Sequence, residues 1–258
     1  MLDLNTIDEY PFLDPERPAP PIYTFNFTDA LGSTLKLFTT NLWLITKIVF
    51  VVITPFEIFR VMSVPNLDDE WQLRATTFVL GAVCKLLIAP ALIYALMKVM
   101  HTGKAPGVSE AYGWGLTRLP RLVICAAIAG ALQAFGYMFL IIPGIMIGMA
   151  LELVYPAAVL EKGSPADILR RSSELTKYRR LEIFGLVIVL WVLTQIITVP
   201  LQVFMDSAAV VPISIFAAVV KDLVEQAATV LSLVIYLSLV QKCIQPRSPV
   251  PIQPASSF

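Results

Sequence analysis

The chain has 258 residues, of which 57% are hydrophobic and only 15% are charged. A soluble domain carries roughly 25% charged residues, so this chain has too few to cover a surface in water. Its 19 basic and 19 acidic residues cancel, and the net charge gives no reason to expect a nucleic-acid partner. The composition therefore excludes an ordinary soluble protein and favours a membrane protein.

The first 34 residues do not have the basic start and short apolar run of a cleavable signal peptide. They carry several acids and a run of prolines between Pro11 and Pro21. Each proline fixes φ and removes a backbone donor, which keeps the chain extended. We therefore expect residues 1–34 to form an acidic, proline-rich, non-helical cytoplasmic tail. Residues 35–243 are expected to form a membrane bundle, and residues 244–258 a second proline-rich tail.

Six apolar stretches follow the first tail and are the candidate membrane spans. A hydrocarbon core about 30 Å thick takes about 20 helical residues. The stretches are continuous rather than alternating, which favours helices, because helices satisfy their own backbone groups in lipid. The expected spans are Leu37–Phe59, Ala75–Met97, Leu122–Ile141, Ile145–Leu160, Ile183–Phe204 and Pro212–Val240.

Two places among these spans are unusual. Pro143-Gly144 leaves almost no loop between the third and fourth spans, so we expect a tight hairpin there. The last stretch is longer than a bilayer requires, and Lys221, Asp222 and Glu225 interrupt it. It is either one tilted helix or a re-entrant piece before a normal span. Lys221 and Glu225 are four residues apart and can pair on one helix face. We expect none of the broken helices that many carriers use.

The basic residues fix the expected orientation. With six spans, one side of the membrane holds most of them, and the opposite side holds Arg60 and Arg74, with Lys221 near it. Such a bias places the richer side, and with it both termini, in the cytoplasm. The residues on that side are Arg17, Lys36, Lys98, Lys104, Arg118, Arg121, Lys162, Arg170, Arg171, Lys177, Arg179, Arg180, Lys242 and Arg247.

A weak internal repeat links the two large loops of that side. Shifting the sequence by 59 residues brings Pro106 onto Pro165 and residues 116–118 onto 175–177. Each loop follows one span and precedes another, so the expected unit is a span, an interfacial helix and a span. The fold class is therefore an all-α integral membrane protein with six transmembrane helices and two cytoplasmic interfacial amphipathic helices.

The second loop has the signals of a helix at the membrane surface. Ser164 is suited to the N-cap, Pro165 to the first helical position, and Asp167 places a carboxylate near the positive helix end. The basic residues of the two loops are a candidate surface for anionic lipid or for docking. The alternative is an ordinary collar that orients the protein. These residues are Arg118, Arg121, Arg170, Arg171, Lys177, Arg179 and Arg180.

Residues 142–177 contain a Pro-Gly hairpin, then Pro156, then the run from Ala166 to Lys177 with Arg171-Ser172 and Leu175-Thr176-Lys177. This pattern resembles a bacterial membrane family that comprises the membrane domain of glycerophosphoryl diester phosphodiesterase and YciC-like proteins. The family pattern continues with a glycine where this chain has Tyr178. The resemblance implies a helical membrane module in the bacterial inner membrane. It implies no catalytic residues.

Three charged residues lie about midway along the expected spans, namely Lys47, Lys85 and Glu152. Charges at that depth are costly, so they should face the bundle interior and find partners. Glu152 is expected to pair with Lys47 or Lys85, which leaves one lysine over. That lysine is either a site for an anionic substrate or a proton step, or a structural residue that reaches toward the interface.

An enzyme is the least supported class. The chain has one histidine, His101, and its three cysteines show no CxxC or Cys/His spacing. We expect no cofactor and no metal site. The first expectation is a non-catalytic accessory or scaffold subunit of a larger membrane assembly, with a protein partner or a homo-oligomer. The alternative is a small transporter or lipid-handling protein that uses the charges midway along the spans. Membrane lipids, some of them anionic, are expected partners in either case.

Overall fold

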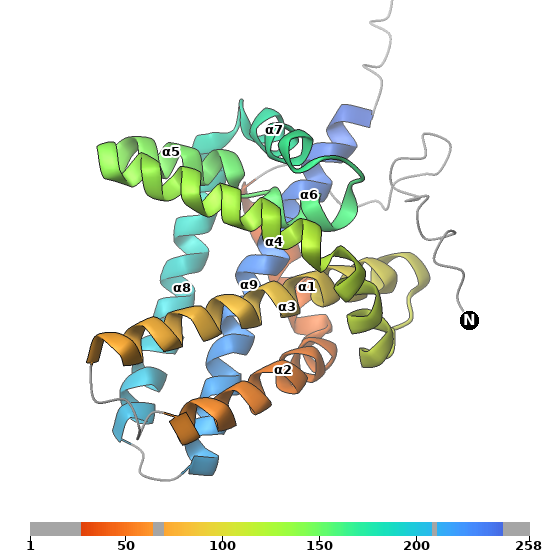
Figure 1. Ribbon diagram of the computed structural model, residues 1–258. Helices are drawn as coiled ribbons and strands as arrows, with labels where there is room; N and C mark the ends of the chain where they lie inside the picture. The colour runs from red at the N-terminus through yellow and green to blue at the C-terminus, as the bar shows by residue number, and fades with distance from the viewer. Residues whose placement is uncertain (1–26, 64–69, 208–210, 245–258) are drawn as a thin grey trace, which may run out of the picture.

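The computed structural model describes residues 27–63, 70–207 and 211–244, whose regular structure is entirely α-helical (Figure 1). This confirms the all-α prediction for the described part of the chain. The helices are α1 (Phe27–Thr40), α2 (Leu42–Ser63), α3 (Glu70–Thr102), α4 (Val108–Phe139), α5 (Ile141–Leu151), α6 (Val154–Leu160), α7 (Pro165–Thr176), α8 (Arg180–Ser207) and α9 (Val211–Ile244).

Six helical stretches among the described residues are long and apolar enough to cross a membrane, in agreement with the six predicted spans. The protein is therefore a multi-pass membrane protein. In the fourth stretch, α5 and α6 follow one another as a single crossing. The stretches are Leu42–Phe59, Ala75–Thr102, Val108–Phe139, Ile141–Leu160, Arg180–Val203 and Phe216–Val240.

The first helix begins earlier than the sequence predicted. Helix α1 starts at Phe27, so residues 27–34, which we assigned to the non-helical tail, are helical, and residues 1–26 lie outside the described part. Asp29 in the first turn favours the helix because its carboxylate faces the positive helix end. Asn41 separates α1 from α2, and its side-chain amide donates to the Leu37 carbonyl, 2.9 Å away.

Helix α9 is the centre of the bundle. It runs through the middle of the view in Figure 1, and α1, α2, α3, α6 and α8 all pack against it. Every residue from Val230 to Val240 is buried. The helix is continuous from Val211 to Ile244, so the long final stretch is one helix rather than a re-entrant piece and a span. Its central position follows from its sequence, which is apolar on nearly all sides between Val230 and Val240.

Helices α4 and α5 form the predicted tight hairpin. Leu140 alone connects them, with an extended backbone (φ −162°, ψ 150°). Pro143 lies in the first turn of α5, where its missing N–H costs no helical hydrogen bond. The helices approach closely because both carry glycine at the contact: a Cβ on Gly136 would lie 2.9 Å from the Gly144 Cα.

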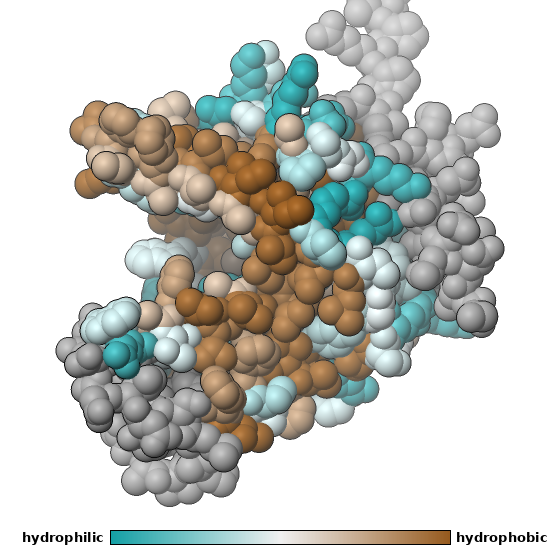
Figure 2. Space-filling model, viewed as in Figure 1, coloured by the Kyte–Doolittle hydropathy of each residue, from teal (hydrophilic) through white to brown (hydrophobic). Residues whose placement is uncertain are grey.

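This hairpin projects away from α2 and α3 in Figure 1, and only 17% of the residues in the most apolar 18-residue part of α4 are buried. Figure 2 shows the hairpin as an apolar arm separated by a hollow from the rest of the molecule. The apolar side chains exposed at its tip are suited to lipid rather than water. They include Phe135, Met138, Phe139, Leu140, Ile141 and Ile142.

The two basic loops differ in structure. The second contains the separate helix α7, but residues 108–121 of the first are the opening turns of α4 and form no helix of their own. These turns are held against α3, because the Tyr94 hydroxyl donates to Glu110 (2.6 Å) and the Tyr94 and Trp114 rings stack at 4.8 Å. The two segments that the 59-residue repeat aligns, residues 106–117 and 165–176, are both largely helical. The repeat itself stays a prediction.

Candidate functional site

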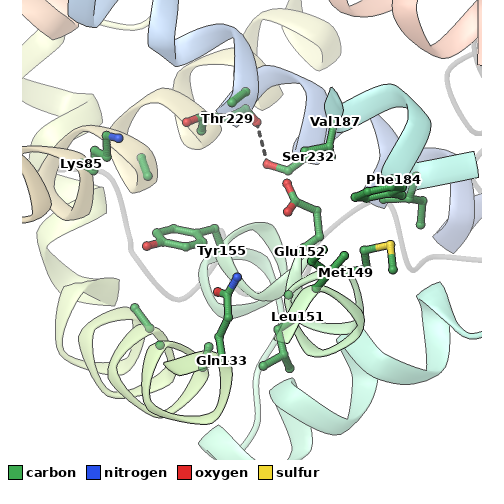
Figure 3. Close-up of a pocket in the computed structure, with 18 of the residues that line it drawn as sticks. Lys85, Gln133, Met149, Leu151, Glu152, Tyr155, Phe184, Val187, Thr229 and Ser232 are labelled. Carbon is green, nitrogen blue, oxygen red and sulfur yellow. Dashed lines mark hydrogen bonds between the residues drawn. The ribbon is translucent and has the colours of Figure 1, made fainter. Parts of the chain in front are cut away.

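A cleft of about 460 Å³ lies between the hairpin and the rest of the bundle (Figures 2 and 3). Helices α4, α5 and α6 form one wall, and α3, α8 and α9 form the other. Its volume is within the range of small-molecule sites. Small residues, among them Ala126, Ala129, Gly130 and Gly148, leave the space open. The polar residues that line it are Lys85, Gln133, Tyr137, Glu152, Tyr155, Glu225, Gln226, Thr229 and Ser232.

The fourth span is broken at the cleft, which corrects our expectation of unbroken helices. Helix α5 ends at Leu151 and α6 begins at Val154, with Glu152 as the C-cap of α5. Pro156 has no N–H to donate to the Glu152 carbonyl, which is a physical cause of the interruption. Broken spans of this kind surround substrate sites in many membrane carriers. The sequence contained this signal, a glutamate four residues before a proline within an apolar run.

Helix α7 packs against α5 and α6, the two halves of the broken span. The buried Ser172 hydroxyl donates to the Ala150 carbonyl at 2.9 Å, and the Thr176 hydroxyl lies 3.4 Å from the same oxygen. A carbonyl next to an interrupted helix would otherwise be left without a full set of partners in an apolar environment. The amphipathic loop helix therefore stabilises the broken span. This role was not predicted from the sequence.

The start of α7 has the predicted N-cap, Ser164, and this residue forms a reciprocal capping box with Asp167. The Ser164 hydroxyl accepts from the Asp167 N–H at 3.3 Å, and the Asp167 carboxylate accepts from the Ser164 N–H at 3.2 Å. The Ser164 hydroxyl also donates to that carboxylate. Hydrogen bonds from the Ser164 side chain and N–H hold the pKa of Asp167 below its ordinary value. The box fixes the first turn of the helix that supports the break.

Glu152 points into the cleft, toward Thr229 and Ser232 of α9 (Figure 3). Among the described residues, no hydrogen bond or ion pair to its carboxylate is found. The polar groups opposite it bond to one another instead. The Ser232 hydroxyl donates to the Thr229 carbonyl (3.1 Å), and the Thr229 hydroxyl donates to the Gln226 side-chain oxygen (3.1 Å).

Lys85 lies at the other end of the polar lining, and its partner is not the predicted one. Its ammonium is 3.2 Å from the Glu225 carboxylate, whereas we expected a pair with Glu152. Lys221 lies 2.9 Å from the same carboxylate, which confirms the predicted pair one helical turn apart on α9. Asp222 and Glu57 lie close enough to Lys221 to act on it electrostatically. We call these five residues the charged cluster.

Lys47, the third residue predicted midway along the spans, does not reach the cleft. Its side chain is exposed on α2, where the ammonium lies 5.1 Å from the centroid of the Trp43 ring. A cation over an aromatic face has a favourable electrostatic contact that needs no acid. The prediction that Lys47 faces the bundle interior was wrong. Sequence spacing gives the depth of a residue in its span but not the rotation of the helix.

The predicted basic surface gathers at the end of the bundle that contains α7, but four of its cations are bonded to groups within the chain. Arg170 pairs with Glu174 at 2.8 Å, Arg171 with Glu161 at 3.4 Å and Arg179 with Glu182 at 2.9 Å. The Arg121 side chain donates to the Ala158 carbonyl at 2.8 Å. Glu161 also accepts from the Tyr236 hydroxyl at 2.7 Å, so the Arg171 contact links α7 to α9.

The remaining three cations of this surface contact aromatic rings or a hydroxyl. Arg118 lies over the Trp114 ring and Lys177 over the Tyr178 ring, at 5.4 Å and 5.6 Å. Arg180 donates to the Ser173 hydroxyl at 3.4 Å. Arg170 and Lys177 are the exposed members of the set. The structure thus brings the predicted residues to one end and gives most of them a structural contact.

Chemistry that needs a metal finds no support in the described residues, which hold no cluster of three or more histidine, cysteine, aspartate or glutamate side chains suited to a metal ion. Cys84 and Cys125 are buried and free. The comparisons with known proteins give no guide: no protein-family model, no curated protein and no solved structure matches this chain. The resemblance of residues 142–177 stays a prediction, and the function is argued from the cleft.

Proposed function

We propose that the protein binds an amphiphilic molecule of the bilayer in the cleft, as a small lipid-handling or carrier protein does. The polar head lies at the break of the fourth span, beside Glu152, and the tail lies between the hairpin and the bundle. The observation that carries this proposal is a carboxylate at a helix break that has no partner among the described residues and faces a cleft among membrane spans. Such groups are expensive in a membrane and are functional by default.

The shape of the cleft supports a ligand with an apolar tail. Its walls beside the polar residues are apolar, with Ile145 and Met149 on α5 and Phe184 and Val187 on α8. The hollow in Figure 2 opens along the side of the hairpin, the direction from which a lipid in the bilayer would enter. A polar solute from water would gain nothing from these walls.

An accessory role, our first expectation from the sequence, has one observation in its favour. The hairpin is the least buried part of the bundle, so a helix of a partner protein has a large apolar surface to pack on. The basic surface supports this role less, because Arg170, Arg171 and Arg179 are paired within the chain. We therefore place the lipid-handling role first.

We also propose that the protein lies in a bacterial inner membrane with both termini and α7 in the cytoplasm. The charge bias of the loops supports this orientation, since the side that contains α7 is the basic one. Fusion of a reporter to either terminus tests it. The test uses a reporter enzyme that is active only outside the cytoplasm. Activity of this reporter at either terminus would contradict the proposal.

The cleft itself is tested by filling it. Gly130 lines the cleft, and nothing lies within 4 Å of a Cβ placed there. Gly113 on the same helix is equally open but lies outside the cleft. The wild type, Gly130→Trp and Gly113→Trp are purified in nanodiscs, and bound lipids are counted by native mass spectrometry. We expect bound lipid in the wild type and Gly113→Trp and its loss in Gly130→Trp. Equal lipid in all three would contradict the proposal.

A further inference from the structure

Several of the polar groups beside Glu152 present hydrogen-bond acceptors to the cleft. The Thr229 and Ser232 hydroxyl hydrogens are donated to Gln226 and to the Thr229 carbonyl, so their oxygens face the cleft as acceptors. The Gln133 amide nitrogen donates to the Tyr137 hydroxyl at 3.3 Å, and its carbonyl oxygen is an acceptor. With the Glu152 carboxylate, these oxygens give this part of the cleft several hydrogen-bond acceptors around one acidic group.

The charged residues of the cleft also favour a cationic ligand over an anionic one. Of the residues that line it, Lys85 is the basic one and Glu152 and Glu225 are the acidic ones. Lys85 is already 3.2 Å from Glu225. The charged cluster as a whole contains two lysines and three acids, so it has no positive surplus to attract an anion. This reverses the sequence-based expectation, which paired Glu152 and left one lysine over for an anionic substrate.

We infer that the head of the bound amphiphile carries a primary ammonium group, which donates its N–H groups to Glu152 and the neighbouring oxygens; this inference rests on the proposed function. A primary ammonium has three donors and a positive charge, and the site supplies oxygen acceptors and a negative charge. A quaternary ammonium has the charge but no N–H, and a phosphate has neither the charge nor the donors. We therefore expect the site to bind a primary ammonium most strongly, a quaternary ammonium less strongly and a phosphate least.

The test uses the full chain in phosphatidylcholine nanodiscs, whose lipids have no primary amine. Three photoreactive probes share one alkyl tail and end in a primary amine, a trimethylammonium or a phosphate. Cross-linked peptides are identified by mass spectrometry. We expect the amine probe to label cleft peptides of α4, α5 and α9 roughly tenfold more than the phosphate probe, the scale of one charge-assisted hydrogen bond. The trimethylammonium probe should fall between them.

Variants assign the preference to one carboxylate. Glu152→Gln should bring the amine and phosphate labelling close to equal, and Glu152→Asp, which keeps the charge, should retain the preference. Glu182→Gln is the matched control, because Glu182 is exposed and lies outside the cleft. It should label as the wild type does. An unchanged preference in Glu152→Gln would overturn the assignment.

The outcomes separate this inference from the proposed function. Cleft peptides labelled equally by all three probes, or most by the phosphate probe, would overturn the ammonium assignment and leave the lipid-binding role standing. Cleft peptides labelled by none of the probes would contradict the proposed function itself. The comparison of heads on the wild type needs no variant, so it decides the inference even if a Glu152 variant does not fold.

Discussion

The ammonium of Lys85 lies 3.2 Å from the carboxylate of Glu225, and this contact joins α3 to α9 at one end of the cleft. The second contact of Glu225, to Lys221, lies within α9 and links no helices. The Lys85 contact therefore helps to set the position of one cleft wall against the central helix. Lys85 is thus in part a structural residue, although it lines the candidate site.

Replacing Lys85 by methionine should destabilise the bundle by about 1 kcal/mol, the scale of a polar contact between helices in a membrane. The charge swap Lys85→Glu with Glu225→Lys should recover part of that loss. Lys47→Met is the control, because Lys47 is exposed and its ammonium lies over the Trp43 ring. Unfolding midpoints in one detergent measure all three. An equal or larger loss in Lys47→Met would contradict the assignment of Lys85.

The contact between α7 and the broken span makes a second prediction. Ser172→Ala leaves the Ala150 carbonyl with only the longer contact from Thr176, so a buried acceptor loses its better partner. We expect a loss of about 1–2 kcal/mol, because a buried unsatisfied polar group costs more than a hydrogen bond contributes. The free energy of unfolding in detergent measures it.

Ser109→Ala is the matched control for this variant, because Ser109 is exposed at the start of α4. Its effect should lie within about 0.5 kcal/mol of zero, as for most surface substitutions. Ser172→Ala should also increase hydrogen exchange at the amides of residues 150–156. If exchange rises in α7 alone, the hydroxyl stabilises only its own helix and not the break.

Much of the fold was predictable because its signals are local. Apolar stretches gave six spans, Pro143-Gly144 gave the hairpin, and Ser164 with Asp167 gave the start of α7. The start of α1 was predicted too late, because the tail was judged by its prolines. The sequence has no proline between Pro21 and Pro55, so nothing of this kind prevents a helix from beginning at Phe27.

The site was predictable only in part, because it depends on helix rotation and on contacts between distant segments. Glu152 and Lys85 were identified by their depth, and both line the cleft. Lys47 has the same depth but faces outward, since its helix presents a different side to the bundle. Glu225 was assigned to the outer part of a long stretch, and nothing near it in the sequence indicates that it meets Lys85.

The glycines of the hairpin give a third prediction. A Cβ on Gly136 would lie 2.8 Å from the Ile147 side chain and 2.9 Å from the Gly144 Cα, so the helices would have to separate. Gly136→Ala should cost about 1–3 kcal/mol, as other overpacked substitutions do. Gly113→Ala meets nothing within 4 Å and should be neutral or slightly stabilising. Unfolding in detergent compares the two variants. A neutral Gly136→Ala would mean that the hairpin is not held by this contact.

The capping box of α7 predicts a pH dependence that is confined to one helix. The hydrogen bonds from Ser164 lower the pKa of Asp167, so the ionised carboxylate stabilises the folded helix. A group with a lowered folded pKa contributes stability above its ordinary pKa of about 3.9 and loses it as the pH falls through the folded value. The first-turn amides of α7 should therefore lose protection below about pH 4.

Hydrogen exchange of α7, corrected for the intrinsic effect of pH, measures this loss. Asp167→Asn should remove most of the dependence, because the amide keeps an acceptor oxygen but has no charge to lose. The first turn of α5 is the internal control, because it has no acidic residue and no side-chain cap hydrogen bond. If α7 and α5 lose protection together, the acid acts on the whole bundle and the capping box is not its cause.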